Sequence, residues 1–450
     1  MSLLLEDAAA RAARYLDGLR ERAVAPPAEA IRGLDRLAEA LPDGPSDPAA
    51  VLERLDQCGS PATMGMAGPR FFGWVIGGSL PAALAANWLA GAWDQNVGLF
   101  AASPIGTVLE EVSLGWLLDV LALPGGCGGG FVSGATVANF TALAAARHAV
   151  LAGAGWDVEA QGLFGAPAIQ VVVGEEVHPS LMKALGMLGM GRERVVRVPV
   201  DRQGRMRAEA LPELTAPAIL CVQAGNVNTG AFDPIAELCR CGHAAGAWVH
   251  VDGAFGLWAA ASPKYAHLAD GIADADSWAT DAHKWLNVPY DSGLAFVRDA
   301  ECLRAAMSIT AAYLPQGAHR EPSQYVPELS RRARGVEIWA ALQSLGRSGL
   351  AEMIERCCRC AGRFADGLAA AGFQVLNEVV LNQVLVSFGA PEETQRVVAA
   401  LQAEGTCWCG GTVWQGQTAM RISVSSWATT FADVDRSLDA MVRVARGGVR

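Results

Sequence analysis

Lysine is scarce in this chain. Among 450 residues there are only three lysines, Lys183, Lys264 and Lys284, whereas arginine supplies nearly all the other positive charge. A lysine was therefore not needed at any of these positions merely for its charge. Because a lysine amine is the side chain that forms Schiff bases with carbonyl compounds, each lysine is a candidate for covalent chemistry. Lys183 lies in a predicted helix and Lys264 in a predicted turn, so we expect both to be solvated.

Other scarcities exclude whole classes of protein. The net charge of −11 argues against nucleic acid as a partner, because a nucleic acid backbone requires neutralisation by Lys and Arg. Residues 1–7 lack the basic start and the apolar core of a signal peptide. The eleven cysteines are an odd number without the spacing of a secreted disulfide scaffold. We therefore expect reduced thiols and a cytoplasmic protein.

Long uncharged runs are also few. Residues 71–93 carry no charge and are long enough to cross a bilayer. However, the small and polar residues 77–79, Pro81 and Asn87 interrupt the run. We therefore expect a buried loop and helix at an active site or a subunit interface, and no membrane span.

The cysteine and glycine patterns contain no metal or nucleotide motif. Structural zinc needs four ligands in paired knuckles, and the cysteines at 357–360 lie in a predicted helix with no histidine close by in sequence. The glycines spell neither a dinucleotide fingerprint nor a Gly-Lys-Ser/Thr loop, and no Gly-x-Ser-x-Gly elbow occurs. We expect no bound metal. The other close cysteine pairs are Cys239/Cys241 and Cys407/Cys409.

Helical and strand patterns alternate over most of the chain. Helical spacing covers residues 1–42 with a break at Pro26-Pro27, and further helices are expected at 48–57, 104–121 and 136–150, the last after a Gly-rich turn at 125–130. Strands are expected at 168–173, 194–200, 218–223, 247–251 and 294–298. Apolar strands separated by helices indicate an α/β fold with a mostly parallel sheet covered on both faces.

The pattern changes after residue 299. A long helix at 333–371 precedes expected strands at 373–376, 383–388 and 418–424, with a helix at 391–404 between them. We therefore expect three parts: an N-terminal helical arm (1–65), a large α/β domain (66–300) and a smaller α/β C-terminal domain (301–450).

Lys284 lies among apolar residues, which argues against a surface position. Its neighbours include Trp278 and Trp285, and 32 residues upstream Asp252 ends an apolar run that Ala254 follows. A pyridoxal phosphate site needs an acid after one strand and a lysine after the next, because the acid serves the pyridine nitrogen and the lysine the aldehyde. Ala254 is small enough to let the ring lie against the backbone. The alternative for Asp252 is an ordinary helix N-cap.

A phosphate site and a stacking residue also have candidates. Ala135 and Thr136 begin a predicted helix after a glycine, and helix-start N–H groups bind anions; an ordinary N-cap is the alternative for Thr136. His178 follows a strand and could stack on the ring, although a lone histidine is more often capped or solvated. His283, beside the lysine, is a candidate contact to the phosphate or the Schiff base.

Taken together, these segments resemble the group II pyridoxal-phosphate-dependent amino acid decarboxylases of fold type I. That family includes aromatic amino acid, glutamate, histidine and cysteine sulfinate decarboxylases. The resemblance runs from about Gly68 to about Asp435, and its most specific part is the ordered set His178, 250–254 and 281–285. It implies a mostly parallel seven-stranded sheet in the large domain. Supporting segments are 69–71, 102–104, 131–136, 331–339 and 421–425.

The resemblance implies roles at the cofactor. Lys284 would form the Schiff base, Asp252 would pair with the pyridine nitrogen, and His178 would stack on the ring. The other implied cofactor contacts are Ala135, Thr136, Asn228, Ala254, Asp281 and His283.

The resemblance also implies a homodimer whose active sites are shared between subunits. Tyr325 would lie on a mobile loop within 301–330 that acts at the partner's active site, where it would protonate the carbanion left after carbon dioxide departs. Arg421 would meet a substrate carboxylate or serve a structural role. Phe72, Trp74 and Phe100 would form an aromatic pocket wall that favours a bulky substrate, or plain interface core.

Two departures from the family pattern place a standard substrate pocket in doubt. Asn226 and Val227 stand where the family often has two threonines, and Val137 stands where the phosphate loop often has a glutamate. The function implied is decarboxylation of an L-amino acid to an amine. The alternatives are a carbon–carbon lyase, an aminotransferase, an aldehyde-forming relative, or a catalytically silent binding protein.

Overall fold

The computed structural model describes residues 1–309 and 319–447. The chain divides into two compact units, and their residues are as follows: unit 1 contains residues 1–78, 360–376 and 384–450, and unit 2 contains residues 79–359 and 377–383. This division differs from the expected boundaries after residues 65 and 300.

Backbone pairing explains why the N-terminal residues group with the C-terminal ones. Phe71 forms a parallel bridge with Trp408, and the Phe72 N–H donates to the Trp408 carbonyl at 2.8 Å. The segment that was expected to open the large domain is thus tied into unit 1. Such pairing joins residues far apart in the chain, so no composition shift marks it in the sequence.

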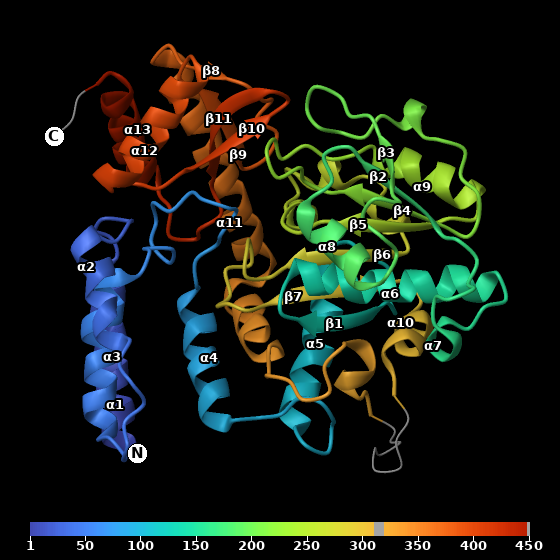
Figure 1. Ribbon diagram of the computed structural model, residues 1–450, viewed down its shortest axis with the longest axis horizontal. Helices are drawn as coiled ribbons and strands as arrows, with labels where there is room; N and C mark the ends of the chain where they lie inside the picture. The colour runs from blue at the N-terminus through green and yellow to red at the C-terminus, as the bar shows by residue number, and fades with distance from the viewer. Residues whose placement is uncertain (310–318, 448–450) are drawn as a thin grey trace. The chain divides into compact units, whose positions relative to one another are not determined.

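Unit 2 is built on a seven-stranded sheet in the order β1-β7-β6-β5-β4-β2-β3 (Figure 1). Its strands are β1 (Gly128–Val132), β2 (Gln170–Gly174), β3 (Val196–Val198), β4 (Ala218–Gln223), β5 (Trp248–Asp252), β6 (Ser277–Asp281) and β7 (Gly293–Val297). Only β7 runs antiparallel to its neighbours, β1 and β6. Several strands are buried at every residue, as expected of strands covered on both faces. The α/β class and the mostly parallel seven-stranded sheet are confirmed.

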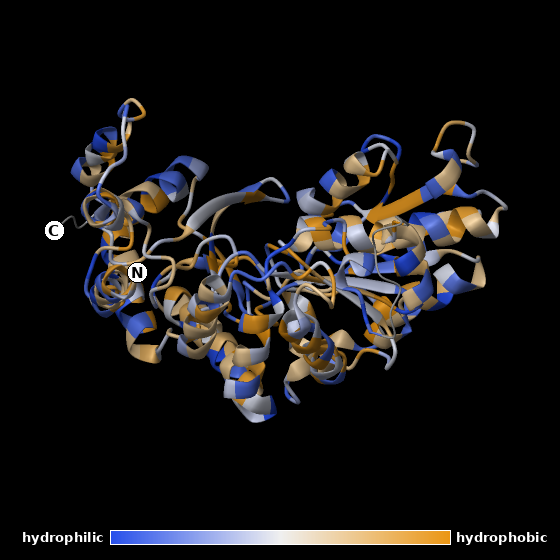
Figure 2. Ribbon diagram, turned by 90° about the horizontal axis from the view of Figure 1, so that it is seen from below, coloured by the Kyte–Doolittle hydropathy of each residue, from blue (hydrophilic) through white to orange (hydrophobic). Residues whose placement is uncertain are grey.

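Helices connect the strands of unit 2, and Figure 2 shows hydrophobic and hydrophilic residues interspersed along the helices of the chain. Those of unit 2 are α4 (Pro81–Trp93), α5 (Pro104–Val120), α6 (Ala135–Gly153), α7 (Val158–Gln161), α8 (Pro179–Met187), α9 (Ile235–Ala244) and α10 (Ala300–Met307). Helix α11 (Gly335–Ala370) belongs to unit 2 up to residue 359 and to unit 1 from residue 360. Short 3-10 helices are η2 (Ala208–Ala210), η3 (Gly256–Ala261), η4 (Ala266–Ala269), η5 (Ile272–Asp274) and η6 (Pro322–Tyr325). Non-helical backbone at Gly346 interrupts α11.

Small side chains bring α6 close to the sheet. Ala138 packs with Val132, Ala279 and Ala295 in one buried cluster, so the helix lies over β1, β6 and β7. Because alanine adds only a methyl group, the helix backbone approaches the strands closely. This packing sets where the first turn of α6 meets the sheet.

The Gly-rich segment at 125–130 was expected to be a turn, but its second half belongs to edge strand β1. Gly125 and Gly126 form the expected turn, with a φ of 86° at Gly126, whereas the glycines of β1 are needed for close approach. A Cβ on Gly129 would lie 2.4 Å from Leu114 Cδ1, and one on Gly130 would lie 2.5 Å from the Tyr325 carbonyl oxygen. Neither clash can be read from the sequence, because both partners are distant in it.

Unit 1 contains a four-stranded sheet in the order β10-β11-β9-β8. Its strands are β8 (Gln374–Val375), β9 (Gln383–Ser387), β10 (Gly410–Trp414) and β11 (Gln417–Ser423). Its helices are α1 (Ser2–Gly18), α2 (Ala28–Gly33), the 3-10 helix η1 (Leu34–Leu37), α3 (Pro48–Ala62), α12 (Pro391–Glu404) and α13 (Phe431–Ala445). Strand β10 was not predicted. It forms a two-residue hairpin with β11 through Gln415 and Gly416, whose φ angles of 46° and 78° suit such a turn.

The uncharged run at 71–93 forms a loop and helix α4. Among residues 1–309 and 319–447, no helix is both long enough and apolar enough to span a bilayer.

A buried ion pair crosses unit 2. Arg331 Nη1 lies 2.6 Å from Glu110 Oε1, and both side chains are almost fully buried. Arg331 also donates to the carbonyls of Val97 and Phe131 at 3.1 and 2.6 Å. Burial raises the pKa of Glu110, and the Arg331 charge opposes that rise. The pair therefore depends on both partners being present.

Replacing Arg331 by Met should lower the free energy of unfolding by about 3 kcal/mol, because Glu110 would remain buried without its cation. Urea denaturation followed by circular dichroism measures this loss. The control is Arg304→Met, which breaks the surface pair between Arg304 and the 74% exposed Glu301 side chain. That change should cost less than about 1 kcal/mol, and equal losses in the two variants would contradict the assignment.

Candidate active site

Loops from one edge of the seven-stranded sheet carry the expected cofactor residues. Strands β1, β2, β4, β5 and β6 point the same way, so their carboxyl ends meet at one edge. In open α/β sheets this is the edge where ligands bind. The loops that leave it carry Ala135, Thr136, His178, Asn228, Asp252, Ala254, His283 and Lys284.

Two backbone hydrogen bonds tie the loop of the acid to the loop of the lysine. The Gly253 N–H donates to the Ala279 carbonyl, and the Asp281 N–H donates to the Ala254 carbonyl, both at 2.9 Å. They extend the parallel ladder beyond the end of β5 and along the rest of β6. The small Ala254 is thereby fixed next to the turn that leads to Lys284.

The Asp252 carboxylate is 4% exposed and accepts two hydrogen bonds. Asn139 Nδ2 donates to Oδ2, and the Ala254 N–H donates to Oδ1, both at 3.2 Å. Burial raises the pKa of Asp252, while the charges of His178 and Lys284 lower it. Two expected cofactor residues therefore lie close enough to act on a third.

Asp252 is not the N-cap of the helix that follows. That position, before η3, belongs to Phe255. The N-cap alternative raised by the sequence thus does not account for the buried acid.

Lys284 is the least exposed of the three lysines. Its side chain is 17% exposed, and Nζ lies 3.1 Å from Asp281 Oδ2. Lys183 and Lys264 are both exposed, as expected. The ion pair with Asp281 keeps the Lys284 amine at the carboxyl edge of the sheet.

The start of α6 forms a close-fitting cradle with the end of β6. Asp281 Oδ1 accepts the Ala135 N–H at 2.6 Å. The first N–H groups of a helix have no partner within the helix, and the positive end of the helix favours anions. A Cβ on Gly293 would lie 2.4 Å from Gly134 Cα, so only glycine lets β7 pass this close. The half-buried Thr136 adds a hydroxyl at the same turn.

His283 faces this cradle as a neutral donor. Its Nδ1 accepts the Ser292 N–H at 3.1 Å, which leaves the proton of the neutral ring on Nε2. Nε2 lies 3.5 Å from Asp281 Oδ1, and the ring stacks on Tyr290 at 4.3 Å. Burial lowers the pKa of His283, and the Asp281 charge opposes that shift. An anion at the start of α6 would therefore meet an N–H donor from His283.

His178 caps helix α8 and also acts on the acid. Its Nδ1 accepts the Ser180 N–H at 3.2 Å and lies 2.7 Å from Ser180 Oγ. The capping alternative is therefore real, and the cap does not remove His178 from the site, because the side chain still lies close enough to Asp252 to influence its pKa. The cap fixes how the imidazole is turned.

Asn228 lies in a tight turn that Asn226 organises. Asn226 Oδ1 accepts the Asn228 N–H at 2.9 Å, and its Nδ2 donates to Glu176 Oε2 at 3.0 Å. Asn226, which stands where the family often has a threonine, is 2% exposed. Its side chain is engaged in these two hydrogen bonds.

Tyr325 lies away from the other expected catalytic residues of its chain. Its ring lies 3.6 Å from the Arg320 guanidinium and packs against a cluster that includes Val297. Val297 pairs with the first residue of β6, whereas Lys284 follows the last. Tyr325 therefore packs toward the end of β6 that is opposite Lys284 of the same chain, and its expected role at the partner's active site stays a prediction. Residues 310–318 of the expected mobile loop lie outside the described residues.

The expected substrate residues are divided between the two units. In unit 1, Phe72 is buried edge-on against Phe364 with ring centroids 5.0 Å apart, which favours the core alternative for Phe72. Arg421 lies half-buried in β11, where burial lowers its pKa. In unit 2, Phe100 stacks on His319 at 3.8 Å.

Trp74 and the Cys407–Cys409 segment form an aromatic cluster in unit 1. Trp408 stacks on Phe71 at 5.1 Å and lies 4.5 Å from the ring of Trp74, which is 55% exposed. Both cysteines are buried and free. Among the described residues, no three His, Cys, Asp or Glu side chains are grouped so as to hold a metal ion.

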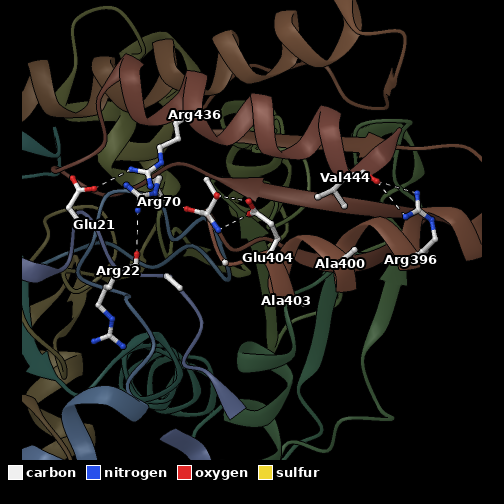
Figure 3. A pocket seen from close by; sticks show the side chains of 12 residues that line it. Glu21, Arg22, Arg70, Arg396, Ala400, Ala403, Glu404, Arg436 and Val444 are labelled. Atoms are coloured by element: carbon white, nitrogen blue, oxygen red, sulfur yellow. Dashed lines mark hydrogen bonds and ion pairs between the residues drawn. The ribbon is translucent and has the colours of Figure 1, made fainter. Parts of the chain in front are cut away.

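Unit 1 also holds a cavity of about 570 Å³ that contains none of the expected cofactor residues (Figure 3). Its charged side chains pair with one another and with the backbone. Arg70 Nε donates to the Thr406 carbonyl at 2.7 Å, and Arg436 lies 3.8 Å from Glu21. These bonds tie helices α12 and α13 to the N-terminal segment, so we assign the cavity a structural role.

Sequence reasoning missed three side chains behind the acid: Asn139, His250 and Ser277. Asn139 lies one helical turn after Ala135, and His250 lies two residues before Asp252 on the same strand face. Helical and strand periodicity could have found the first two. Ser277 begins a strand of its own, and no pattern linked it to the others.

A lysine amine, a buried acid and an anion-binding helix start at one sheet edge define an enzyme that uses pyridoxal phosphate. The residues fit this cofactor: an N–H-rich cradle suits the phosphate, and Asp252 suits a protonated ring nitrogen. The cofactor would be held by Lys284, Asp252, His178 and the first turn of α6.

Comparison with known proteins gives the family. The pyridoxal-dependent decarboxylase conserved domain matches residues 30–390, so the chain belongs to this family and is a pyridoxal-phosphate-dependent carboxy-lyase. Tyrosine decarboxylase 2 of Narcissus pseudonarcissus is 27% identical over 87% of this chain and 83% of its own. The acidic amino acid decarboxylase GADL1 of Mus musculus is 30% identical over 69% and 58%. A solved structure of Oryza sativa TDC with PLP and tryptamine has a TM-score of 0.92 at 22% identity, covering 99% and 97%.

Replacing His250 by Gln should flatten the acid limb of the stability profile. Burial lowers the pKa of His250 from 6.5 to about 3, so between these pH values only the unfolded chain binds its proton. Stability from His250 is thus complete above pH 6.5 and is lost on acidification, by about 1.4 kcal/mol per pH unit. Urea titrations at several pH values measure this slope. Identical slopes in wild type and His250→Gln would contradict the prediction.

Proposed function

We propose that this enzyme removes the carboxylate of an L-amino acid as carbon dioxide and releases the amine, with Lys284 as the residue that holds the cofactor. The observation that carries the proposal is the placement of Lys284 and the buried Asp252 at the carboxyl ends of two adjacent parallel strands, β6 and β5, where the Lys284 amine lies 3.1 Å from Asp281 Oδ2. A structural ion pair would not need to be placed where the loops of five parallel strands meet.

Each residue of the site has a physical task under this proposal. When bound, pyridoxal phosphate supplies an electron sink for the bond that breaks at the substrate's alpha carbon. Asp252 would hold a proton on the ring nitrogen, and His178 would lie against the ring. The first turn of α6 and His283 Nε2–H bind the phosphate, which requires Asp281 to share the Ala135 N–H.

Related reactions use the same groups. A carbon–carbon lyase, an aminotransferase and an aldehyde-forming decarboxylase also need the lysine and the acid, and they differ in which bond the bound substrate presents. Only products separate these alternatives. Relatives named for tyrosine and for acidic amino acids lie at similar identity, so the side-chain class of the substrate is a further question for the same assay.

Incubation with a panel of aromatic, acidic and aliphatic L-amino acids should release carbon dioxide and amine in equal amounts from at least one. Product analysis by mass spectrometry and a carbon dioxide assay measure both. Lys284→Ala should lower kcat by on the order of 10³-fold or more, because no other amine can take its place.

Matched controls make this test specific. Lys264→Ala and Lys183→Ala each remove an exposed lysine and should leave kcat unchanged. Borohydride should fix the yellow chromophore to the peptide that contains Lys284. Aldehyde and ammonia without amine would contradict decarboxylation to the amine, and a colourless protein that takes up no cofactor would contradict the site itself.

We also propose that the enzyme is a cytoplasmic homodimer. An apolar stripe on α5, formed by Ile105, Val108 and Val112, is exposed in the single chain, and its spacing follows one helix face. Trp88 and Trp93 of α4 are exposed as well. Contiguous exposed apolar surface is typical of subunit interfaces. The odd number of cysteines, without the spacing of a secreted disulfide scaffold, fits a reducing compartment, and cell fractionation tests this location.

Replacing Val108 by Asp should halve the molar mass measured by light scattering after gel filtration, because a carboxylate cannot be buried at an apolar interface without a partner. Phe164→Asp is the control: Phe164 is 97% exposed and lies outside the stripe, so this change should leave the mass unaltered. A Val108→Asp protein with the mass of wild type would contradict the interface.

A further inference from the structure

A continuous chain of hydrogen bonds runs beneath Asp252, between the sheet and α6. Trp248 Nε1 lies 2.8 Å from Ser277 Oγ, and Ser277 Oγ lies 2.9 Å from His250 Nδ1. His250 Nε2 lies 2.8 Å from Asn139 Oδ1, and Asn139 Nδ2 lies 3.2 Å from Asp252 Oδ2. Ser277, His250 and Asn139 are fully buried, so water does not exchange with the chain.

The chemistry of its first member sets the direction of this chain. An indole N–H can only donate, so Ser277 Oγ accepts from Trp248 and gives its own proton to His250 Nδ1. The neutral imidazole then carries its proton on Nε2 and donates to Asn139 Oδ1. The Asn139 amide must therefore present its NH₂ to Asp252, which is left as a pure acceptor.

The opposite direction of hydrogen-bond donation is unfavourable for two reasons. If His250 carried its proton on Nδ1, the buried Ser277 hydroxyl would lose its acceptor within the chain. Asn139 would then turn its NH₂ to His250 and its oxygen to Asp252, so that two acceptors would face each other at 3.2 Å. That arrangement is tolerable only if Asp252 carries a proton. The order of donors is therefore coupled to the ionisation of Asp252.

We propose that Asn139 and His250 are positioning residues that hold Asp252 as an ionised, correctly turned acceptor for the ring nitrogen of pyridoxal phosphate. The inference rests on the proposed role of Asp252. Under this proposal, Trp248 and Ser277, at the amino ends of β5 and β6, determine the ionisation state of Asp252, which lies at the carboxyl end of β5. The other charged groups that act on Asp252 are His178 and Lys284.

Asn139→Leu tests this proposal, because leucine nearly keeps the volume but removes both hydrogen bonds. The dissociation constant of the holoenzyme for pyridoxal phosphate should rise by about tenfold or more, as expected for a lost bond to a buried charge. The pH midpoint of the bound cofactor's absorbance should shift as well. Thr141→Val is the matched control: it removes a buried hydroxyl of the same helix that bonds only the Val137 carbonyl at 2.8 Å, and it should change neither quantity.

A double-mutant cycle separates this proposal from a general packing effect. In an Asp252→Asn background, Asn139→Leu should cost little further affinity, because its partner charge is already gone. Equal costs in both backgrounds, or an unchanged absorbance midpoint, would overturn the proposal. If Asp252→Asn itself keeps wild-type affinity, the proposed role of Asp252 fails instead.

Ser277→Ala keeps the proposal testable if Asn139→Leu does not fold. It removes only the hydroxyl at the far end of the chain, so the absorbance midpoint should shift in the same direction by a smaller amount. A folded Ser277→Ala protein with the midpoint of wild type would overturn the proposal, since the order of donors would then not begin at Trp248.

Discussion

The burial of one carboxylate constrains the rest of this active site. Asp252 is almost fully removed from water, and a buried charge is stable only when hydrogen bonds and opposite charges compensate for lost solvation. Asn139 and the Ala254 N–H supply the bonds, while Lys284 supplies a charge that lowers the pKa of Asp252. The groups that stabilise the acid also include those that a cofactor with a basic ring nitrogen and an aldehyde would contact.

The topology of the sheet makes this convergence possible. Six of the seven strands run in the same direction, so loops from distant parts of the chain leave at one edge. Alanine contacts hold α6 close to β1, β6 and β7, and the contact of Gly293 with Gly134 brings the start of that helix to Asp281. Small residues thus determine where the anion-binding end of α6 lies, although none of them takes part in the chemistry.

Much of the candidate site could be predicted from local sequence because its parts follow strand ends. The rarity of lysine singled out Lys284, and an acid after one strand with a lysine after the next predicted neighbouring loops, which the bonds from Gly253 and Asp281 confirm. Strand β1 was missed because its glycines are also typical of turns. These positions require glycine because Leu114 and the Tyr325 backbone lie too close to leave room for a Cβ. The burial of Phe72 against Phe364 could not be predicted from local sequence either, because the two residues are far apart in the chain.

The sequence by itself determined the class of fold and the family, and it predicted which lysine and which acid would serve the cofactor, since periodicity and short motifs are local properties. Only the tertiary structure decided that Ser277, His250 and Asn139 form an ordered chain behind Asp252, that Tyr325 packs at the far end of β6, and that residues 1–78 group with the C-terminal strands. These features join positions far apart in the chain. Their energies depend on distances and burial that exist only once the sheet and its helices have assembled.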